Sequence, residues 1–352
     1  MSSETKDLSI KGESIQSLYG SFLAKHFLVN RRYQRKLVWS LDEKRSFIDS
    51  IIKGYPVPLI LLAEVTGDKG KRLEIIDGMQ RMNAIMSFID QEFDIDGSFF
   101  DLDTMADTKF LKDEGKIKQK TPKMERALCA DIVRYQIPLS VFQESGTSHI
   151  DEVFRRLNSG GKHLSKQELR QAGALSKFAA IVRKLSSNVR GDSSATDILD
   201  LNSMKNISIT NRHLDYGISV DDIFWVQNNI ISKEDLRQSK DEEVIADIVA
   251  WVCLDKGLRS SSEILNQLYG FNSYDSSLSG QLEIQIQKIN EETISDNIQY
   301  VFDKLIDIIN ESGQTFNALL FDNQQAKIAR YFQIVFLSFY NLLIDEELDI
   351  EN

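Results

Sequence analysis

The hydrophobic pattern changes character along the chain. All four prolines lie at or before position 138, and beyond it apolar residues recur at spacings of three and four, which is typical of amphipathic helices. Two such stripes occupy 241–254 and 294–309. A third, at 331–344, contains Gln333 and Asn341 and is too short for a membrane span, which favours a buried or interface helix. The second half is therefore predicted to be helical.

The first half alternates between strand-like and helix-like patterns. Ser40 and Glu43 form a capping box, in which each side chain satisfies a backbone N–H group of the other residue, and the helix that follows ends at Gly54. Ser165 and Glu168 repeat this arrangement. The pattern predicts strands at 57–65, 73–76 and 137–142, further helices from 78, at 150–157 and from 166, and loops at 186–194 and 273–280.

Composition places the chain among globular proteins. It has 352 residues, of which 42% are hydrophobic and 27% are charged, a size that suggests about two domains. Its two cysteines, Cys129 and Cys253, lie too far apart in sequence for a metal-ligand or redox motif, so neither a zinc site nor a disulfide scaffold is expected. The N-terminus lacks the apolar region of a signal peptide, and a cytoplasmic protein with no membrane segment is expected.

Charge is distributed unevenly along the chain. Residues 1–190 contain 31 Lys and Arg against 25 Asp and Glu, a balance of +6, whereas residues 191–352 contain 11 against 28, a balance of −17. A basic half can contact the phosphates of a nucleotide or of DNA, and an acidic half is repelled by a DNA backbone. The acidic helices could simply aid solubility, bind a basic partner or pair with a second copy of the chain to form a homo-oligomer.

Cationic and aromatic side chains gather in residues 30–39. This segment contains four cations, and Tyr33, Gln34 and Arg35 lie at its centre. Arginine offers two parallel donors to a phosphate, and an aromatic ring can stack against a base. The segment therefore favours nucleotide or nucleic-acid binding, with a solvent-exposed basic strand edge as the alternative.

A second cluster follows the strand predicted at 73–76. In the sequence Asp77-Gly-Met-Gln-Arg81, Gly78 links the strand to a helix whose first turn carries Gln80 and Arg81. The N-terminus of a helix has free N–H groups and a positive dipole, so this turn is a predicted phosphate site. Asp77 could bind Mg²⁺ beside the phosphates or merely cap the helix.

A third cluster breaks the chain between two predicted helices. It includes Arg155, Arg156 and Asn158 and continues through two glycines to Ser165. An Asn side chain and several free backbone N–H groups can converge on one ligand, to which the arginines add positive charge. The alternative is an Asn-Gly helix stop that binds nothing.

Together and in this order, the three clusters resemble the N-terminal domain of GmrSD-type restriction systems, a relative of the ParB/sulfiredoxin fold. The resemblance covers residues 15–175. It implies an α+β fold, with a ParB/sulfiredoxin-like domain and a small mixed sheet at 1–175, followed by an all-α domain at 176–352. The second block of the family usually reads Asp-Gly-Gln-Gln-Arg, so Met79 is a departure that replaces a polar side chain beside the predicted phosphate site.

The resemblance implies a nucleotide-binding, NTP-hydrolysing domain that controls DNA cleavage in phage defence. On this hypothesis a nucleoside triphosphate and Mg²⁺ occupy the site, and a separate nuclease or DNA-recognition subunit is the partner. The implied catalytic residues are Asp77, Gln80 and Arg81, with Asp77 as the metal ligand. The implied nucleotide-binding residues are Tyr33, Gln34, Arg35, Asp77, Gly78, Gln80, Arg81, Arg155 and Asn158.

Two other functions remain open. Members of the wider ParB-like group are described as nucleases, but a nuclease needs several carboxylates around its metal ions and Asp77 is the only acid inside the motifs. The other function is a non-catalytic partner-binding protein with a vestigial pocket, which Met79 favours. No histidine follows His213, so a C-terminal His-Asn nuclease is not expected, and no Walker-type phosphate loop is present.

Overall fold

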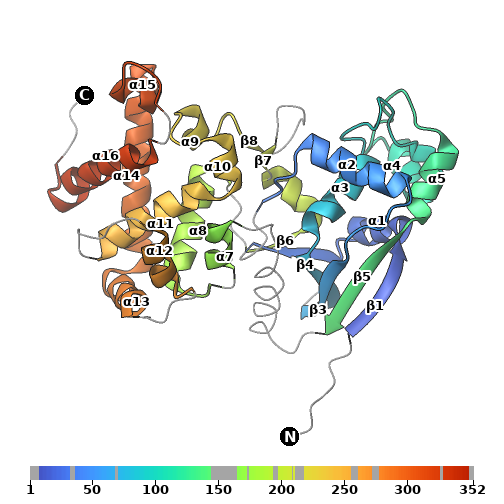
Figure 1. Cartoon of the computed structure of the whole chain (residues 1–352), viewed down its shortest axis with the longest axis horizontal. Helices are drawn as coiled ribbons and strands as arrows, with labels where there is room; N and C mark the ends of the chain where they lie inside the picture. Colours follow the sequence, from blue (N-terminus) through green and yellow to red (C-terminus); the bar gives the residue numbers. More distant parts are fainter. Residues whose placement is uncertain are drawn as a thin grey trace, which may run out of the picture. The chain divides into compact units, whose positions relative to one another are not determined.

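The structure is a computed structural model, and it divides the chain into two compact units (Figure 1). Unit 1 comprises Met1–Phe154 and Ser194–Gly217, and unit 2 comprises Arg155–Ser193 and Ile218–Asn352. This differs from the expected boundary at 175, because the helix that follows Ser165 packs with later helices and a strand at 198–200 pairs with the first half. The described residues are 8–31, 36–67, 70–143, 165–172, 174–192, 197–207, 209–210, 218–254, 261–271, 277–325 and 328–348.

Unit 1 is built on a six-stranded mixed sheet in the order β1-β5-β3-β4-β2-β6. β2 runs parallel to β4 and β3 runs parallel to β5, while the other neighbouring pairs are antiparallel. The strands are β1 (Leu8–Ser14), β2 (Phe27–Asn30), β3 (Ile60–Gly67), β4 (Gly70–Asp77), β5 (Gln136–Gln143) and β6 (Ile198–Asp200). β3 begins three residues later than predicted because Pro56 and Pro58 have no N–H group to donate to a ladder.

Five α-helices of unit 1 accompany this sheet in the part of the chain that the structure describes. Apolar side chains from α1, α2, α3 and α5 pack with those of the central strands in one core. The helices are α1 (Ile15–Leu23), α2 (Leu41–Ile52), α3 (Met79–Ile89), α4 (Ala106–Asp113) and α5 (Arg126–Arg134), with 3-10 turns η1 (Leu102–Thr104) and η2 (Leu201–Ile207) and the short strand β7 (Ile209–Thr210).

The predicted capping box at the start of α2 is confirmed. The Ser40 N–H group donates to Glu43 Oε2 over 2.6 Å, and the Glu43 N–H group donates to Ser40 Oγ over 3.3 Å. Gly54 follows the helix with a φ of +67°, in the left-handed region that favours glycine. Both ends of α2 are therefore fixed by local sequence.

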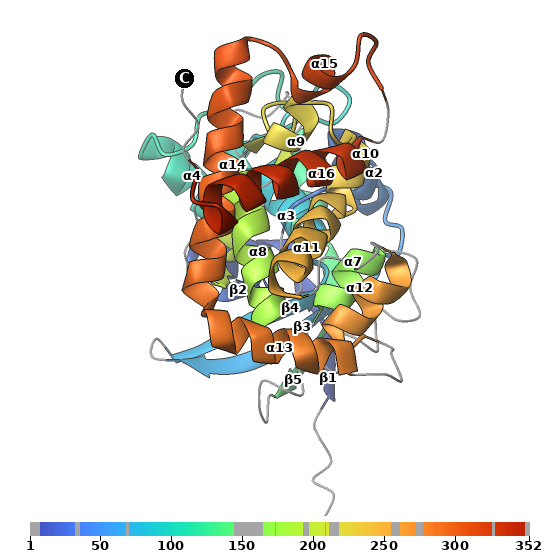
Figure 2. The ribbon, with the colours of Figure 1, turned by 90° about the vertical axis from the view of Figure 1, so that its left-hand side faces the viewer.

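Unit 2 is a helical assembly, and its helices face the viewer in Figure 2. Among its described residues β8 (Ile218–Ser219) is the only strand. The helices are α7 (Lys166–Gln171), α8 (Lys177–Val189), α9 (Phe224–Gln227), α10 (Lys233–Arg237), α11 (Lys240–Cys253), α12 (Ser262–Tyr269), α13 (Ser277–Ile289), α14 (Glu291–Ser312), α15 (Phe316–Leu320) and α16 (Ala329–Tyr340), which continues into the π-helical turn η3 (Asn341–Asp345).

The three predicted helical stripes of this half are confirmed as α11, α14 and α16. The two predicted loops were partly wrong, because α8 continues through Val189 and α13 begins at Ser277. In α8 the apolar spacing persists through Leu185 and Val189 to the helix end, and Ser186 beside them is fully buried. Serine content therefore misled the loop prediction, although the apolar spacing of α8 itself indicates a helix.

The core of unit 2 is aromatic. The rings of Trp225, Phe302 and Phe332 lie with their centroids 5.0–5.8 Å apart. One face of α16 is buried in this core, while Tyr331 and Ile334 on another face are 52% and 54% exposed. The buried part of the predicted stripe is confirmed, and its use as an interface stays a prediction. No described helix is both long and apolar enough to cross a membrane.

Candidate functional site

The first two sequence clusters begin at one edge of the sheet in unit 1. Because β2 runs parallel to β4, the carboxyl ends of both strands lie at the same edge. Asn30 ends β2 and Asp77 ends β4. The Asn30 Nδ2 atom donates to Glu74 Oε1 over 3.2 Å, which joins the two strands through side chains. The structure therefore brings the start of the cation-rich segment to the predicted phosphate turn.

Gly78 makes the turn from β4 into α3. Its φ of +99° lies in the left-handed region, where a residue with a side chain is strained. A Cβ atom at this position would lie 2.9 Å from Ile60 Cγ1 and 3.2 Å from Arg81 Nη2. The turn thus needs glycine for its conformation and also for the space that Ile60 and Arg81 occupy.

The N-terminus of α3 has no side-chain cap. Asp77 does not cap the helix, as one alternative had proposed, and instead its Oδ2 atom accepts a hydrogen bond from Arg81 Nη2 over 2.7 Å. The Asp77 side chain is 55% exposed and the Arg81 side chain only 12%. The largely buried Arg81 side chain is therefore held beside an uncapped helix N-terminus by a carboxylate that solvent can reach. The guanidinium and the helix N-terminus both attract an anion.

Gln80 connects the two clusters. Its Nε2 atom donates to the backbone oxygen of Lys36 over 2.9 Å, and its Oε1 atom accepts from the N–H groups of Val38 and Trp39 over 3.1 and 3.3 Å. Both ends of the amide are therefore occupied by the chain segment that precedes α2. In this structure Gln80 fixes the backbone of residues 36–39 against the first turn of α3.

Several predicted site residues lie outside the described part of the chain. They are Tyr33, Gln34, Arg35, Arg155, Arg156 and Asn158. The described residues that flank the first group are held in place, because the Arg31 N–H group donates to the Asp197 oxygen over 2.7 Å and Gln80 holds Lys36. Both flanks of the segment 32–35 therefore belong to unit 1, next to the Asp77–Arg81 turn or to β2.

Met79 lies in the core and does not line the turn. Its side chain is 5% exposed and packs among the buried apolar residues of unit 1. The expectation that Met79 replaces a polar side chain beside the phosphate site was wrong, because the first residue of α3 points inward. The departure at Met79 is therefore a core substitution, and it does not support a vestigial pocket.

Sequence reasoning missed a buried polar group between α2 and α3. Asn83 is one helical turn beyond Gln80 and is 7% exposed, and its Oδ1 atom has no hydrogen-bond partner among the described residues. On the facing helix, Lys44 is buried and donates to Ser87 Oγ over 3.4 Å. Burial lowers the pKa of Lys44, although the nearby Glu92 charge opposes the shift. The available signal in the sequence was the spacing of Asn83 and Ser87 at i+3 and i+7 from Gln80, which places all three side chains on one face of the helix.

The carboxylates of the described residues form no group of three or more metal-ligating side chains. At the candidate site Asp77 is a single exposed carboxylate. Magnesium is commonly bound by one or two carboxylates together with substrate phosphates and water. Asp77 therefore fits a Mg²⁺ ion that receives most of its ligands from a bound nucleotide, and it does not fit a metal held by protein alone.

The last sequence block is described from Ser165 onward and lies in unit 2. The Ser165 N–H group donates to Glu168 Oε2 over 2.8 Å, and the Glu168 N–H group donates to Ser165 Oγ over 3.2 Å, so this capping box is confirmed as well. Its helix, α7, carries Arg170, whose side chain is completely buried. This block caps a helix of unit 2, whereas the Asp77–Arg81 turn presents a carboxylate to solvent.

Residues 15–175 match the family described as GmrSD restriction endonuclease, N-terminal domain. These residues therefore belong to the GmrSD N-terminal domain family, which confirms the resemblance drawn from the sequence clusters and associates the chain with restriction-type defence. The matched range contains the whole Asp77–Arg81 turn and also α7 of unit 2. A search of curated proteins found no match to the chain.

Proposed function

We propose that unit 1 binds and hydrolyses a nucleoside triphosphate as part of a DNA-directed, restriction-type defence system. In this proposal the chain acts with a separate nuclease or DNA-recognition subunit, and its first domain is ParB-like in fold. The family match supports the restriction-type role. The nucleotide, its hydrolysis and the partner come from the chemistry of the Asp77–Arg81 turn and from the family resemblance.

The observation that carries the proposal is the pairing of Arg81 with Asp77 at an uncapped helix N-terminus. The Arg81 side chain is 12% exposed, and its Nη2 atom lies 2.7 Å from Asp77 Oδ2. Such a site has guanidinium donors, the positive end of the helix dipole and free N–H groups that an incoming phosphate can use. Because Arg81 is already held in place, little side-chain freedom is lost when an anion binds.

In this proposal the residues of the turn have different roles in nucleotide binding. Arg81 and Gly78 contact phosphate, and Asp77 receives Mg²⁺, which supplies neutralisation of phosphate charge when bound. Gln80 acts as a positioning residue, because both ends of its amide hold the backbone of residues 36–39. Tyr33, Gln34, Arg35, Arg155 and Asn158 remain proposed contacts for base, sugar or phosphate.

Calorimetric titration of the full chain with ATP, GTP, CTP and UTP in the presence of Mg²⁺ tests the proposal. We expect one or more nucleotides to bind, and Arg81→Ala to weaken that binding by about tenfold or more, because a charged hydrogen bond contributes about 1.5–3 kcal/mol. Release of inorganic phosphate measures hydrolysis, which Asp77→Asn should reduce.

Arg72→Ala is the matched control. Arg72 also lies in unit 1 and pairs with one aspartate, Asp200, over 3.1 Å, but it lies near the start of β4, away from the turn. It should leave nucleotide affinity unchanged. Equal affinities of the Arg81→Ala variant and the unmodified chain, or equal losses in both variants, would remove the proposed site.

A further inference from the structure

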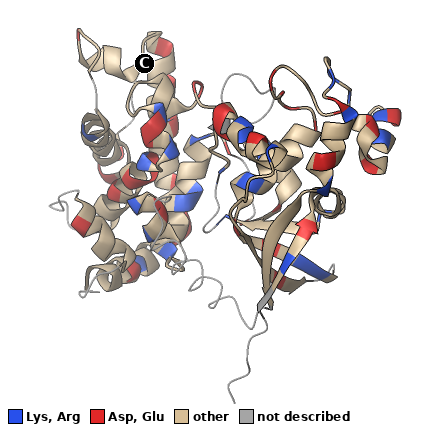
Figure 3. Ribbon diagram, turned by 45° about the vertical axis from the view of Figure 1, so that its right-hand side comes forward, with Lys and Arg blue, Asp and Glu red and all other residues tan. Residues whose placement is uncertain are grey.

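Residues 115–124, here called the lysine loop, connect α4 to α5 in unit 1. The loop contains four lysines and no carboxylate. Asp113 and Glu114 precede it and Glu125 follows it, so the acidic residues are confined to its ends. Within the loop itself the charge is entirely positive. Figure 3 marks the charged positions by sign, and acidic residues recur along the helices of unit 2.

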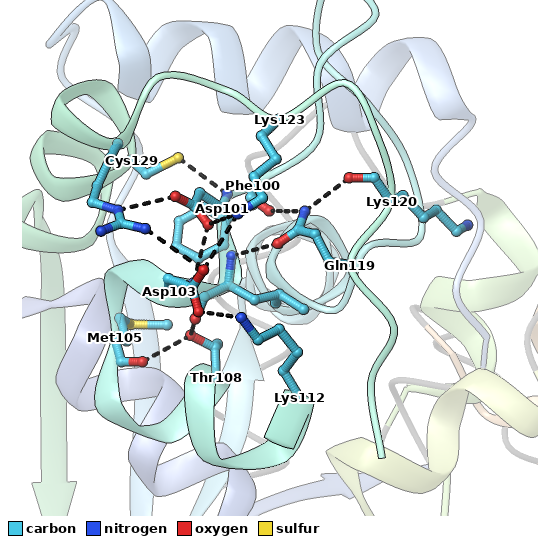
Figure 4. Close-up of polar contacts among 12 residues, drawn as sticks. Phe100, Asp101, Asp103, Met105, Thr108, Lys112, Gln119, Lys120, Lys123 and Cys129 are labelled. Atoms are coloured by element: carbon cyan, nitrogen blue, oxygen red, sulfur yellow. Dashed lines mark hydrogen bonds and ion pairs between the residues drawn. The ribbon is translucent and has the colours of Figure 1, made fainter. Parts of the chain in front are cut away.

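One half-buried amide, that of Gln119, holds the middle of the lysine loop. Gln119 Nε2 donates to Gln91 Oε1 and to the Phe100 oxygen over 2.9 and 3.0 Å, and Gln119 Oε1 accepts from the Leu102 N–H group over 2.9 Å. The Lys120 N–H group donates to the same Gln91 oxygen over 3.0 Å. Figure 4 shows Gln119 pointing into this network while the Lys120 side chain points away from it.

Ion pairs hold the far end of the loop. Lys123 Nζ lies 3.1 Å from Asp101 Oδ1 and 3.3 Å from Asp103 Oδ2, and Arg126 Nε lies 3.0 Å from Asp101 Oδ2. Lys112 on α4 also pairs with Asp103 (Figure 4). Asp101 and Asp103 are thus paired with three cations. Their negative charge is already neutralised and does not compensate the other lysines of the loop.

Lys116, Lys118 and Lys120 are exposed, and none of them has a carboxylate partner in the described part of the chain. The ammonium of Lys116 lies 5.8 Å from the ring centre of Phe110, which is 59% exposed, and that of Lys120 lies 5.5 Å from the ring centre of Phe99. Contact with an aromatic face orients an ammonium without neutralising it. Three charges are therefore presented from a loop whose backbone is fixed.

We propose that the lysine loop contacts the phosphate backbone of duplex DNA. Duplex DNA is a dense line of negative charge, and lysines that replace its counterions provide affinity without sequence preference. The fixed loop has three lysines without a carboxylate partner among the described residues, next to the exposed ring of Phe110 on α4, and this is the charge that such a polymer requires. This inference rests on the DNA-directed role proposed above, but it does not rest on nucleotide binding at the Asp77–Arg81 turn.

The loop and the nucleotide turn lie at opposite ends of one helix. Gln91, which holds Gln119, immediately follows the C-cap of α3, and Gly78 precedes the first residue of α3. An 11-residue helix is about 16 Å long, so the two surfaces are separate. Changes in the lysine loop should therefore leave the nucleotide site intact.

Binding of the full chain to labelled duplex DNA of mixed sequence, measured from about 50 to 200 mM salt, tests the inference. The variant carrying Lys116→Gln, Lys118→Gln and Lys120→Gln should bind at least about tenfold more weakly. The slope of log affinity against log salt should fall by about three, one for each phosphate contact removed. Replacement of the same three lysines by arginine should retain the binding.

A second triple variant controls for bulk charge. Lys11→Gln, Lys53→Gln and Lys71→Gln remove three exposed lysines of unit 1 that pair with Glu13, Asp49 and Glu64 over 2.6–2.8 Å. This variant has the same net charge as the loop variant and should bind DNA nearly as well as the unmodified chain. Equal weakening in both variants, or no weakening in the loop variant, overturns the inference.

Two further measurements separate this inference from its alternatives. If polyglutamate or duplex RNA displaces the labelled DNA better than unlabelled duplex DNA does, the loop recognises another polymer and the inference is wrong. Nucleotide titration of the loop variant should give unchanged affinity. Loss of DNA binding with intact nucleotide binding supports the loop assignment, whereas absence of DNA binding in the unmodified chain overturns it and leaves the nucleotide site untouched.

Discussion

Two arginines within the family-matched range show how differently the same side chain can be used. Arg81 in unit 1 pairs with one carboxylate that is 55% exposed. Arg170 in unit 2 is completely buried, and its guanidinium donates to Asn266 Oδ1, Glu243 Oε1 and Ser262 Oγ over 2.7–2.8 Å, with longer bonds to Gln167 and to a backbone oxygen.

The difference lies in the number of donors that remain for a ligand. Every nitrogen of Arg170 has a protein acceptor, so a ligand could reach it only by breaking the packing of α7 with α11 and α12. Arg81 has a single described acceptor, which solvent can reach. Arginine in a family block therefore indicates a binding site only when its partners are few and accessible.

The largest expected effect is on stability when Arg170 is removed. Arg170→Ala leaves Glu243, Asn266 and Ser262 without their buried partner, and loss of one member of a buried pair costs about 3–5 kcal/mol. Arg81→Ala should cost about 1 kcal/mol or less, because its partner stays hydrated. The free energy of unfolding in urea measures both.

Lys184→Ala is the control in unit 2, because Lys184 is exposed on α8 and its loss should change stability by about 0.5 kcal/mol at most. Equal losses for the Arg170 and Arg81 variants would contradict the comparison, since they would mean that Arg81 is as structural as Arg170.

The next effect concerns the turn that presents Arg81. Gly78→Ala forces a side chain into the left-handed region, at about 1–2 kcal/mol, and adds a clash with Ile60 that costs about 1–3 kcal/mol more. Gly70→Ala is matched in backbone, with φ +91°, but has no atom within 4 Å of the added Cβ. Thermal unfolding of the two variants should differ by the cost of the clash. Equal melting temperatures would show that Ile60 moves aside.

The smallest effect concerns Asp101, whose ion pairs are more exposed than those of Arg170 and more buried on the carboxylate side than that of Arg81. Its carboxylate is 6% exposed, but its partners Lys123 and Arg126 reach solvent. Burial alone would raise the pKa of Asp101, yet the Asp103 N–H group and the side chains of Lys123 and Arg126 donate to it and lower the pKa below the ordinary value.

A lowered pKa in the folded state means that Asp101 adds stability above its unfolded pKa of about 3.9, and that this stability is lost as pH falls below that value. The difference in free energy of unfolding between the unmodified chain and Asp101→Asn should therefore be constant from about pH 5 to 7 and shrink below about pH 4. Asp131→Asn, at a side chain 76% exposed, is the control. A difference that grows on acidification would contradict this assignment.

Local sequence signals gave the helices and the turn of the candidate site. The two capping boxes, at Ser40 and Ser165, depend on residues three positions apart, so their hydrogen bonds could be predicted without knowing the rest of the fold. The same holds for the strand-glycine-helix turn at Gly78 and for the apolar stripes of α11 and α14. These features are properties of a few consecutive residues.

Edge strands and long-range partners could not be predicted in this way. β1 pairs antiparallel with β5, with Leu8 opposite Phe142. Ile10 in β1 is 69% exposed, so the strand has little of the alternation of buried and exposed residues that would predict it from sequence. Gln80 was expected to touch phosphate because its type and position suit an anion site. Its amide instead meets backbone groups about 40 residues earlier in the chain, at Lys36 and Val38.

The sequence by itself determined where the capped helices α2 and α7 start, which halves of the chain are basic or acidic, and that an Asp-Gly turn opens a helix beside an arginine. Only the tertiary structure decided that Met79 is a core residue, that the donors of Arg170 are all occupied while Arg81 pairs with one solvent-exposed carboxylate, and that Gln119 anchors the lysine loop. The physical reason is range: caps and periodicity depend on neighbours within one or two turns, whereas burial and the saturation of hydrogen-bond donors depend on residues brought together from distant parts of the chain.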